Sequence, residues 1–220
     1  MVDYSKIGKG GIVKEGIFER FPQLTPSSLP KNWGCSNSHN KLMIVMESNY
    51  FKDNVDSVFK DPEAWYTGTD TNHLIPQEIK NLVENDKAGY LPFDRLLKSM
   101  NQVLTEIQCE HIYDEALFYN YFLRPATGSN SFRRFCKPID KEVAGVALCG
   151  ILETNKPDIV IFASKFAYDE FSKYKKSVGY VPNNIVIDFV YHPSDRFHKW
   201  NINPNSKQKF EKLLKDYWIK

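Results

Sequence analysis

The chain has 220 residues, a formal net charge of +2, and 15 Phe, 12 Tyr and 4 Trp. This length predicts a single domain, 1–220, in which an irregular N-terminal segment at 1–40 flanks an α/β core at 41–220. No apolar stretch is long enough to span a bilayer, and the first residues lack the apolar segment of a signal peptide. We therefore expect a monomeric cytoplasmic protein that has no membrane partner.

Cysteine and histidine spacing argues against a metal site. The four cysteines contain no C-x-x-C pair, which is the spacing typical of zinc ribbons and iron–sulfur clusters. His39, His73 and His111 show no ligand spacing. We expect no metal and no other cofactor, and this cysteine pattern is typical of a reducing cytosol.

The first half of the chain predicts loop, strand and helix in turn. Residues 1–40 are rich in Gly, Pro, Ser and Asn and predict loop or peripheral structure. An apolar run without alternation at 42–46 predicts a strand buried on both faces. Residues 54–72 are polar and irregular. Apolar residues then recur at helical spacing within 75–108, which predicts a helix.

The second half of the chain repeats this alternation. Pro138 near the start of a periodic segment, with acidic residues in the first turn, marks a helix N-terminus. The further apolar runs lie at 116–125, 158–164 and 186–191, and the further helices at 138–154, 165–176 and 206–217.

This order predicts an α/β fold, a three-layer α/β/α sandwich with a central four-stranded, mainly parallel sheet. Ligands bind such sheets outside the carboxyl ends of the strands, so the residues after each apolar run are candidates for a site. Those segments are Glu47-Ser48-Asn49-Tyr50, Asn120 with Leu123-Arg124-Pro125, Ser164-Lys165, and His192-Pro193-Ser194.

These strand ends together resemble the uracil-DNA glycosylase superfamily over most of the chain from Leu42 to Trp200. "MIVMESNYF" resembles its first motif, a strand ending in a short turn that holds the hydrolytic water. "LFYNYFLRP" resembles its middle strand, where an asparagine reads the base. "KPDIVIFASKFAYDEF" resembles its third strand and the following helix, and "HPSDRFHKW" resembles its second motif, a loop that enters DNA.

The resemblance implies hydrolysis of the N-glycosidic bond of uracil or another damaged base that is flipped out of DNA. His192 matches the histidine that donates to the leaving base, as a donor in an oxyanion hole does. Asn120 matches the asparagine whose amide pairs with the base edge. Tyr50 matches a position where an aromatic ring blocks the thymine methyl.

The expected partner is DNA. From Lys165 onward the chain has eleven Lys/Arg and six Asp/Glu, which suits an anionic partner, although a solvated lysine-rich helix also accounts for this excess. Phosphate contacts would come from the loop after the second motif and from basic residues elsewhere. The predicted contacts are Ser194, Arg196, Lys199 and Arg124, with the Arg133-Arg134 loop.

The first motif departs from the family pattern. Ser48 stands where the most active branch has an aspartate, and the usual glycine and proline are missing around it. Glu47 and Asn49 are the remaining candidates to orient a water. Leu123 stands where iron–sulfur branches have a cysteine, so the resemblance implies no cluster.

Two other functions stay open on the sequence. One is a non-catalytic relative that binds nucleic acid or a nucleobase in the same pocket. The other is a small-molecule hydrolase that uses Ser48 or Ser164 with His192, although the chain has no G-x-S-x-G elbow. Each site residue also has a structural interpretation: His192 as a capped loop residue, and Asn120 and Glu47 as hydrogen-bonding partners of nearby loops.

Overall fold

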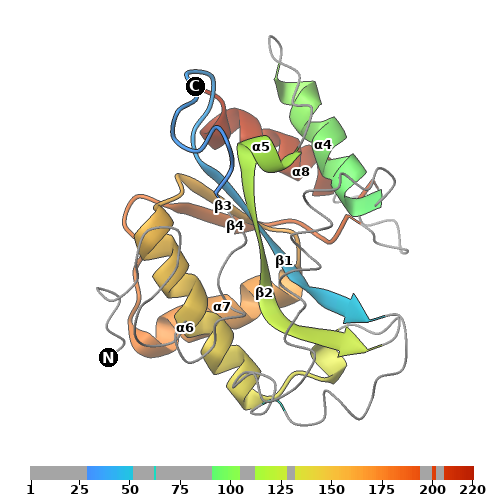
Figure 1. Cartoon of the computed structure of the whole chain (residues 1–220), viewed down its shortest axis with the longest axis vertical. Helices are drawn as coiled ribbons and strands as arrows, with labels where there is room; N and C mark the ends of the chain where they lie inside the picture. Colours follow the sequence, from blue (N-terminus) through green and yellow to red (C-terminus); the bar gives the residue numbers. More distant parts are fainter. Residues whose placement is uncertain are drawn as a thin grey trace.

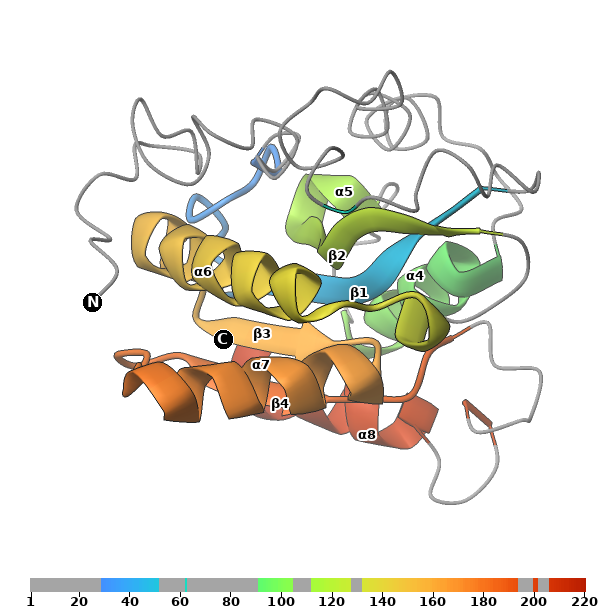
Figure 2. The same cartoon turned by 90° about the horizontal axis from the view of Figure 1, so that it is seen from below.

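The structure, a computed structural model, describes residues 29–51, 62, 91–104, 112–127, 132–193, 200–201 and 206–220. In this part of the chain four parallel strands form one sheet in the order β2-β1-β3-β4. Figure 2 shows the strands in that order from top to bottom. The strands are β1 (Leu42–Phe51), β2 (Ala116–Thr127), β3 (Ile159–Phe162) and β4 (Val186–Phe189).

Helices cover both faces of the sheet and complete the predicted three-layer α/β/α sandwich (Figure 1). One face packs against α6 (Pro138–Asn155) and α7 (Lys165–Val178). The other packs against α4 (Leu91–Val103), α8 (Ser206–Leu213) and the π-helical segment η5 (Leu214–Trp218). The four-residue helix α5 (Ile112–Glu115) leads directly into β2, and the 3₁₀ turn η4 (Phe132–Arg134) lies between β2 and α6.

The central strands are buried on both faces, as their unalternating apolar sequences predict. All four residues of β3, and residues 42–45 of β1, have no exposed surface. Met43 and Val45 belong to the core under α6 and α7, whereas Leu42 and Ile44 belong to the core under α4 and α8. The sheet therefore separates two apolar cores, each closed by its own helices.

The short turn expected after the first apolar run is absent, which is a correction to the sequence-based prediction. Strand β1 continues to Phe51, and a register shift against β2 lies between Ser48 and Tyr50. Because β2 extends alongside to Thr127, the backbone of the polar residues has hydrogen-bonding partners and stays extended. A continuous strand with a register shift thus takes the place of the turn.

The last helix also ends differently from its prediction. The α-helical part stops at Leu213, and the chain continues as the π-helical segment η5, in which Ile219 N donates to Leu214 O. Within this segment Trp218 is fully buried and Tyr217 is exposed. The C-terminal residues then reach the segment before β1, where Ile219 forms a bridge with His39.

Arg124 is part of the core, and this overturns its prediction as a DNA contact. The residue is 1% exposed, and its Nε and Nη2 donate to the two carboxylate oxygens of Asp140 at 2.7 and 2.6 Å. Nη2 also donates to Phe135 O, and the guanidinium lies over the Phe132 ring. Asp140 also accepts a hydrogen bond from Lys137 N, so the Arg124–Asp140 pair joins β2 and η4 to the start of α6. The guanidinium of Arg124 is thereby enclosed and has no access to a phosphate.

Helices α6 and α7 approach each other closely at Gly145. A Cβ placed on Gly145 would lie 2.2 Å from Cγ of Tyr174, far inside van der Waals contact. The ring of Tyr174 occupies the space that any larger residue would need. A glycine is therefore required here by packing and not by backbone conformation.

We expect Arg124→Ala to lower the free energy of unfolding by about 3–5 kcal/mol, because it leaves the Asp140 carboxylate buried without its partner. Urea denaturation measures this. Arg134→Ala is the control, since Arg134 is exposed and its change should stay within about 0.5 kcal/mol. Equal losses for both variants would contradict a structural role for the pair.

We expect Gly145→Ala to destabilise the protein by about 1–3 kcal/mol through overpacking against Tyr174. Thermal and urea unfolding of the variant measure the loss. The same substitution in a Tyr174→Ala background should cost much less, because the ring that it meets is gone. An unchanged cost in that background would place the clash elsewhere.

Candidate functional site at the carboxyl ends of the strands

The predicted site residues fall at one end of the sheet. Four residues, one from each strand, pair side by side and form a row across the sheet. Each site residue can be placed by the number of positions that separate it from this row along its own strand. Asn120 is the first residue after this row on its strand, and Glu47 and Ser164 are the second on theirs. Ser48 and His192 are the third. The row consists of Tyr119, Val45, Phe162 and Phe189.

Glu47 and Ser164 are brought into contact from neighbouring strands. Ser164 Oγ donates to Glu47 Oε2 at 2.8 Å. Ser164 Oγ also accepts a hydrogen bond from Ala167 N at 3.3 Å, so Ser164 is the N-cap of α7. Its backbone is extended, as an N-cap residue requires. The carboxylate of Glu47 is thereby held on the side of the sheet that α7 covers.

Asn120 lies on the other side of the sheet. Its neighbours Tyr119 and Tyr121 belong to the core under α6 and α7, and side chains alternate along a strand. Phe118, two residues before it, packs in the core under α4 and α8. Asn120 and Glu47 thus share the carboxyl end of the sheet but start from opposite faces. Asn120 is half-buried.

The segment after β4 lies against α4. Pro193 is buried, and its carbonyl oxygen accepts a hydrogen bond from Nη1 of Arg95 in α4. Val190 belongs to the core that includes α4. The first turn of α4 also contacts β2, because the ring of Phe93 meets that of Phe118 at 5.2 Å. Helix α4 therefore connects the strand that carries Asn120 with the segment that carries the half-buried His192.

Ser48 is enclosed by the protein. It is 7% exposed, and its hydroxyl has no hydrogen-bond partner among the described residues. A serine hydroxyl has little basicity and cannot replace the carboxylate that the family resemblance places here. The carboxylate of Glu47 is the acidic group that the structure does place at this strand end.

Several predicted residues cannot be placed as side chains. Asn49 and Tyr50 are part of β1, but their side chains lie outside the described residues. Ser194, Arg196 and Lys199 lie outside the described residues altogether. Their proposed contacts with a base or with phosphate remain predictions from the sequence.

A basic turn lies beside the Glu47–Ser164 pair. Phe132 and Phe166 both stack on Phe122, which places η4 against the first turn of α7. Arg133, which belongs to η4, lies over the Phe166 ring, and its guanidinium carbon is 4.8 Å from the ring centroid. Arg133 and Arg134 are both exposed. The predicted Arg133-Arg134 loop is therefore located at the carboxyl end of the sheet.

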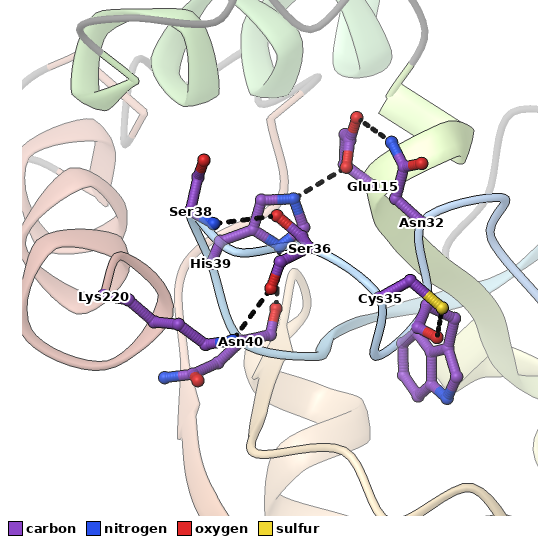
Figure 3. Close-up of polar contacts among 9 residues, drawn as sticks. Asn32, Cys35, Ser36, Ser38, His39, Asn40, Glu115 and Lys220 are labelled. Carbon is purple, nitrogen blue, oxygen red and sulfur yellow. Dashed lines mark hydrogen bonds and ion pairs between the residues drawn. The ribbon is translucent and has the colours of Figure 1, made fainter.

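A second polar cluster lies at the amino ends of the strands (Figure 3). His39 Nε2 is 2.7 Å from Glu115 Oε2, and Asn32 Nδ2 donates to Glu115 Oε1 at 2.6 Å. The His39 ring packs on Trp218, with 4.7 Å between centroids. Asn40 N donates to Trp218 O. This cluster ties the segment before β1 to α5 and to the C-terminus, and its position opposite the strand ends gives it a structural role.

Sequence reasoning missed this cluster, and no local signal could have found it. His39 and Glu115 are 76 residues apart and belong to no motif. The bond between Ser164 and Glu47 has no local signal in the sequence either, because the pairing of β1 with β3 brings the two residues together. A polar residue immediately before a predicted helix was a usable signal for its capping role.

Burial raises the pKa of two phenols of β2 and of one thiol, so these groups stay protonated. Desolvation raises the pKa of Tyr119 and of Tyr121 well above the usual value. Burial, followed by the nearby charge of Asp140, raises the pKa of the Cys136 thiol to about 12. Cys136 is thus a thiol at neutral pH and has no nucleophilic character.

Among the described residues, no group of three or more His, Cys, Asp or Glu side chains is arranged to hold a metal ion. None of the described helices is long and apolar enough to cross a membrane. No model of a known protein family matches the chain, and no curated protein matches its sequence.

Proposed function

We propose that this chain is a divergent relative of the uracil-DNA glycosylase superfamily, which hydrolyses the N-glycosidic bond of uracil or another damaged base in DNA. The observation that carries the proposal is the position of Glu47, Asn120 and His192. All three lie within three residues of one row at the carboxyl end of a parallel sheet, where α/β proteins bind ligands. The α/β/α sandwich is also the fold that the resemblance implies.

In this proposal the target nucleotide is flipped out of the duplex and enters the carboxyl end of the sheet. The bond between the base nitrogen and the sugar carbon breaks, and its electron pair leaves with the base. His192 donates a hydrogen bond to the base oxygen on which this negative charge grows. The amide of Asn120 offers a donor and an acceptor to the pairing edge of the base.

Glu47 serves the sugar side of the reaction. Its carboxylate offsets the positive charge that develops on the sugar as the base departs. A water attacks the sugar carbon and forms a new C–O bond, and its proton passes to the departing base by way of the carboxylate. The products are the free base and an abasic site. Ser164 holds the carboxylate by a hydrogen bond that is already formed.

A non-catalytic relative that binds nucleic acid in the same place is the second candidate. Glu47 and Asn120 start from opposite faces of the sheet, which favours binding without chemistry. The small-molecule hydrolase is not carried forward. Ser164 Oγ is engaged by Glu47 and by the α7 backbone, and Ser48 is enclosed, so neither has the exposed position of a nucleophile.

For the catalytic proposal, we expect His192→Ala to slow base release by about a hundred- to a thousandfold, because its bond strengthens as charge develops. Glu47→Gln should also slow the reaction. Ser48→Ala should cost at most about tenfold, since a hydroxyl contributes little acid–base catalysis. The measurement is single-turnover base release from oligonucleotides carrying uracil, hypoxanthine or xanthine, followed by alkaline cleavage of abasic sites.

Circular dichroism of each variant controls for folding. Wild-type rates in all three variants would show that the chemistry lies elsewhere. A wild-type protein that releases no base from any of these substrates, in single or double strands, would leave the binding candidate in place.

For the DNA partner, we expect affinity to fall linearly on a plot of log K against log salt, since phosphate contacts release counterions. Arg133→Ala/Arg134→Ala should weaken binding and reduce the magnitude of the slope by about two. Gel-shift titrations of duplex and single strands at several salt concentrations measure both effects.

The matched control is Lys176→Ala/Lys215→Ala. It removes the same charge from exposed positions at the end of α7 and in η5, away from the carboxyl ends of the strands. Equal losses in the two double variants would mean that net charge, and not this turn, governs binding. Absence of any binding at low salt would contradict both nucleic-acid candidates.

A further inference from the structure

In the hydrogen bond between Glu47 and Ser164, the available hydrogens determine which group donates and which accepts. The hydroxyl of Ser164 has one hydrogen, and Ala167 N–H donates to its oxygen. Its own hydrogen is therefore available for donation, and Glu47 Oε2 lies 2.8 Å away. A carboxylate accepts only, so the bond runs from Ser164 to Glu47. Ser164 is 3% exposed, which limits the competition of water for this bond.

Helix α7 strengthens the donation. Ser164 accepts from the first turn of a 14-residue helix, whose N-terminus has partial positive charge. Hydrogen bonds in series polarise one another, so the bond from Ala167 makes the hydroxyl a better donor to the carboxylate. The negative charge of Glu47 is thereby coupled to the N-terminus of α7 through one side chain.

The ammonium group of Lys165 is directed away from this contact. Lys165, the next residue, donates to Asp169 one turn along α7, at 2.6 and 2.9 Å to its two oxygens. Lys165 Nζ also lies 5.4 Å from the centroid of Phe189 on β4. Its charge is thus directed along α7 and toward β4, while the hydroxyl of Ser164 is in direct contact with Glu47.

We propose that Ser164 is the positioning residue for the Glu47 carboxylate in the glycosidic cleavage, an inference that rests on the proposed function. The bond to Oε2 restricts rotation of the Glu47 side chain. A carboxylate fixed before the reaction stabilises developing positive charge without the cost of reorganisation. Ser164 itself contacts neither the base nor the sugar.

The test separates this role from helix capping. Ser164→Gly removes the hydroxyl, while glycine at an N-cap costs only a few tenths of a kcal/mol relative to serine. Ser164→Thr keeps both the donor and the cap. Thr154→Val removes a hydroxyl that donates to a backbone carbonyl within α6, and it is the control for loss of a side-chain hydrogen bond elsewhere.

In single-turnover base release from uracil-containing DNA, we expect Ser164→Gly to lower the maximal rate about ten- to a hundredfold, the range for a bond to a charged group. The enzyme concentration that gives half-maximal rate should change little, because substrate binding is not affected. Ser164→Thr should recover most of the rate, and Thr154→Val should match wild type.

The double variant Ser164→Gly/Glu47→Gln is the decisive test. If Ser164 acts through Glu47, then Ser164→Gly should have no further effect in a Glu47→Gln background. A wild-type rate for Ser164→Gly, or the same loss with and without the Glu47 carboxylate, would overturn the positioning role and leave the glycosylase proposal intact. A wild-type protein that releases no base from any substrate would overturn the glycosylase proposal and this inference together.

Discussion

The burial of β1 and β3 on both faces is the constraint on which the rest of the structure depends. Neither strand has a solvent-facing side along its core residues, so helices must cover each face of the sheet. Parallel pairing then brings all four carboxyl ends to one side. The candidate site exists because this topology gathers residues that are up to 145 positions apart, from Glu47 to His192.

Polar groups are placed where the apolar layers end. The Arg124–Asp140 ion pair is enclosed between β2 and α6, and its cost of desolvation is offset by hydrogen bonds to both carboxylate oxygens and to the backbone. The pair secures η4, whose two exposed arginines border the strand ends. At the opposite end of the sheet, His39 joins the segment before β1 to Glu115 of α5 and to Trp218 near the C-terminus. These polar connections fix the segments that flank the sheet at both of its ends.

The proposed reaction depends on the Glu47 carboxylate and its environment. Glu47 is held by a hydroxyl that also caps a helix, so a single side chain connects strand β1, strand β3 and α7. On the other face, α4 contacts both the strand of Asn120 and the segment of His192.

The sequence by itself determined the α/β class, the four strands and the sandwich, because apolar runs without alternation and helical periodicity are local patterns. It also located the strand ends that carry Glu47, Asn120 and His192. Only the tertiary structure decided that Arg124 is buried, that β1 continues through Ser48, and that Ser164 contacts Glu47. Each of these depends on a partner distant in the chain: Asp140, strand β2, and the pairing of β1 with β3. Long-range contacts leave no local pattern, and folding is what brings the partners together.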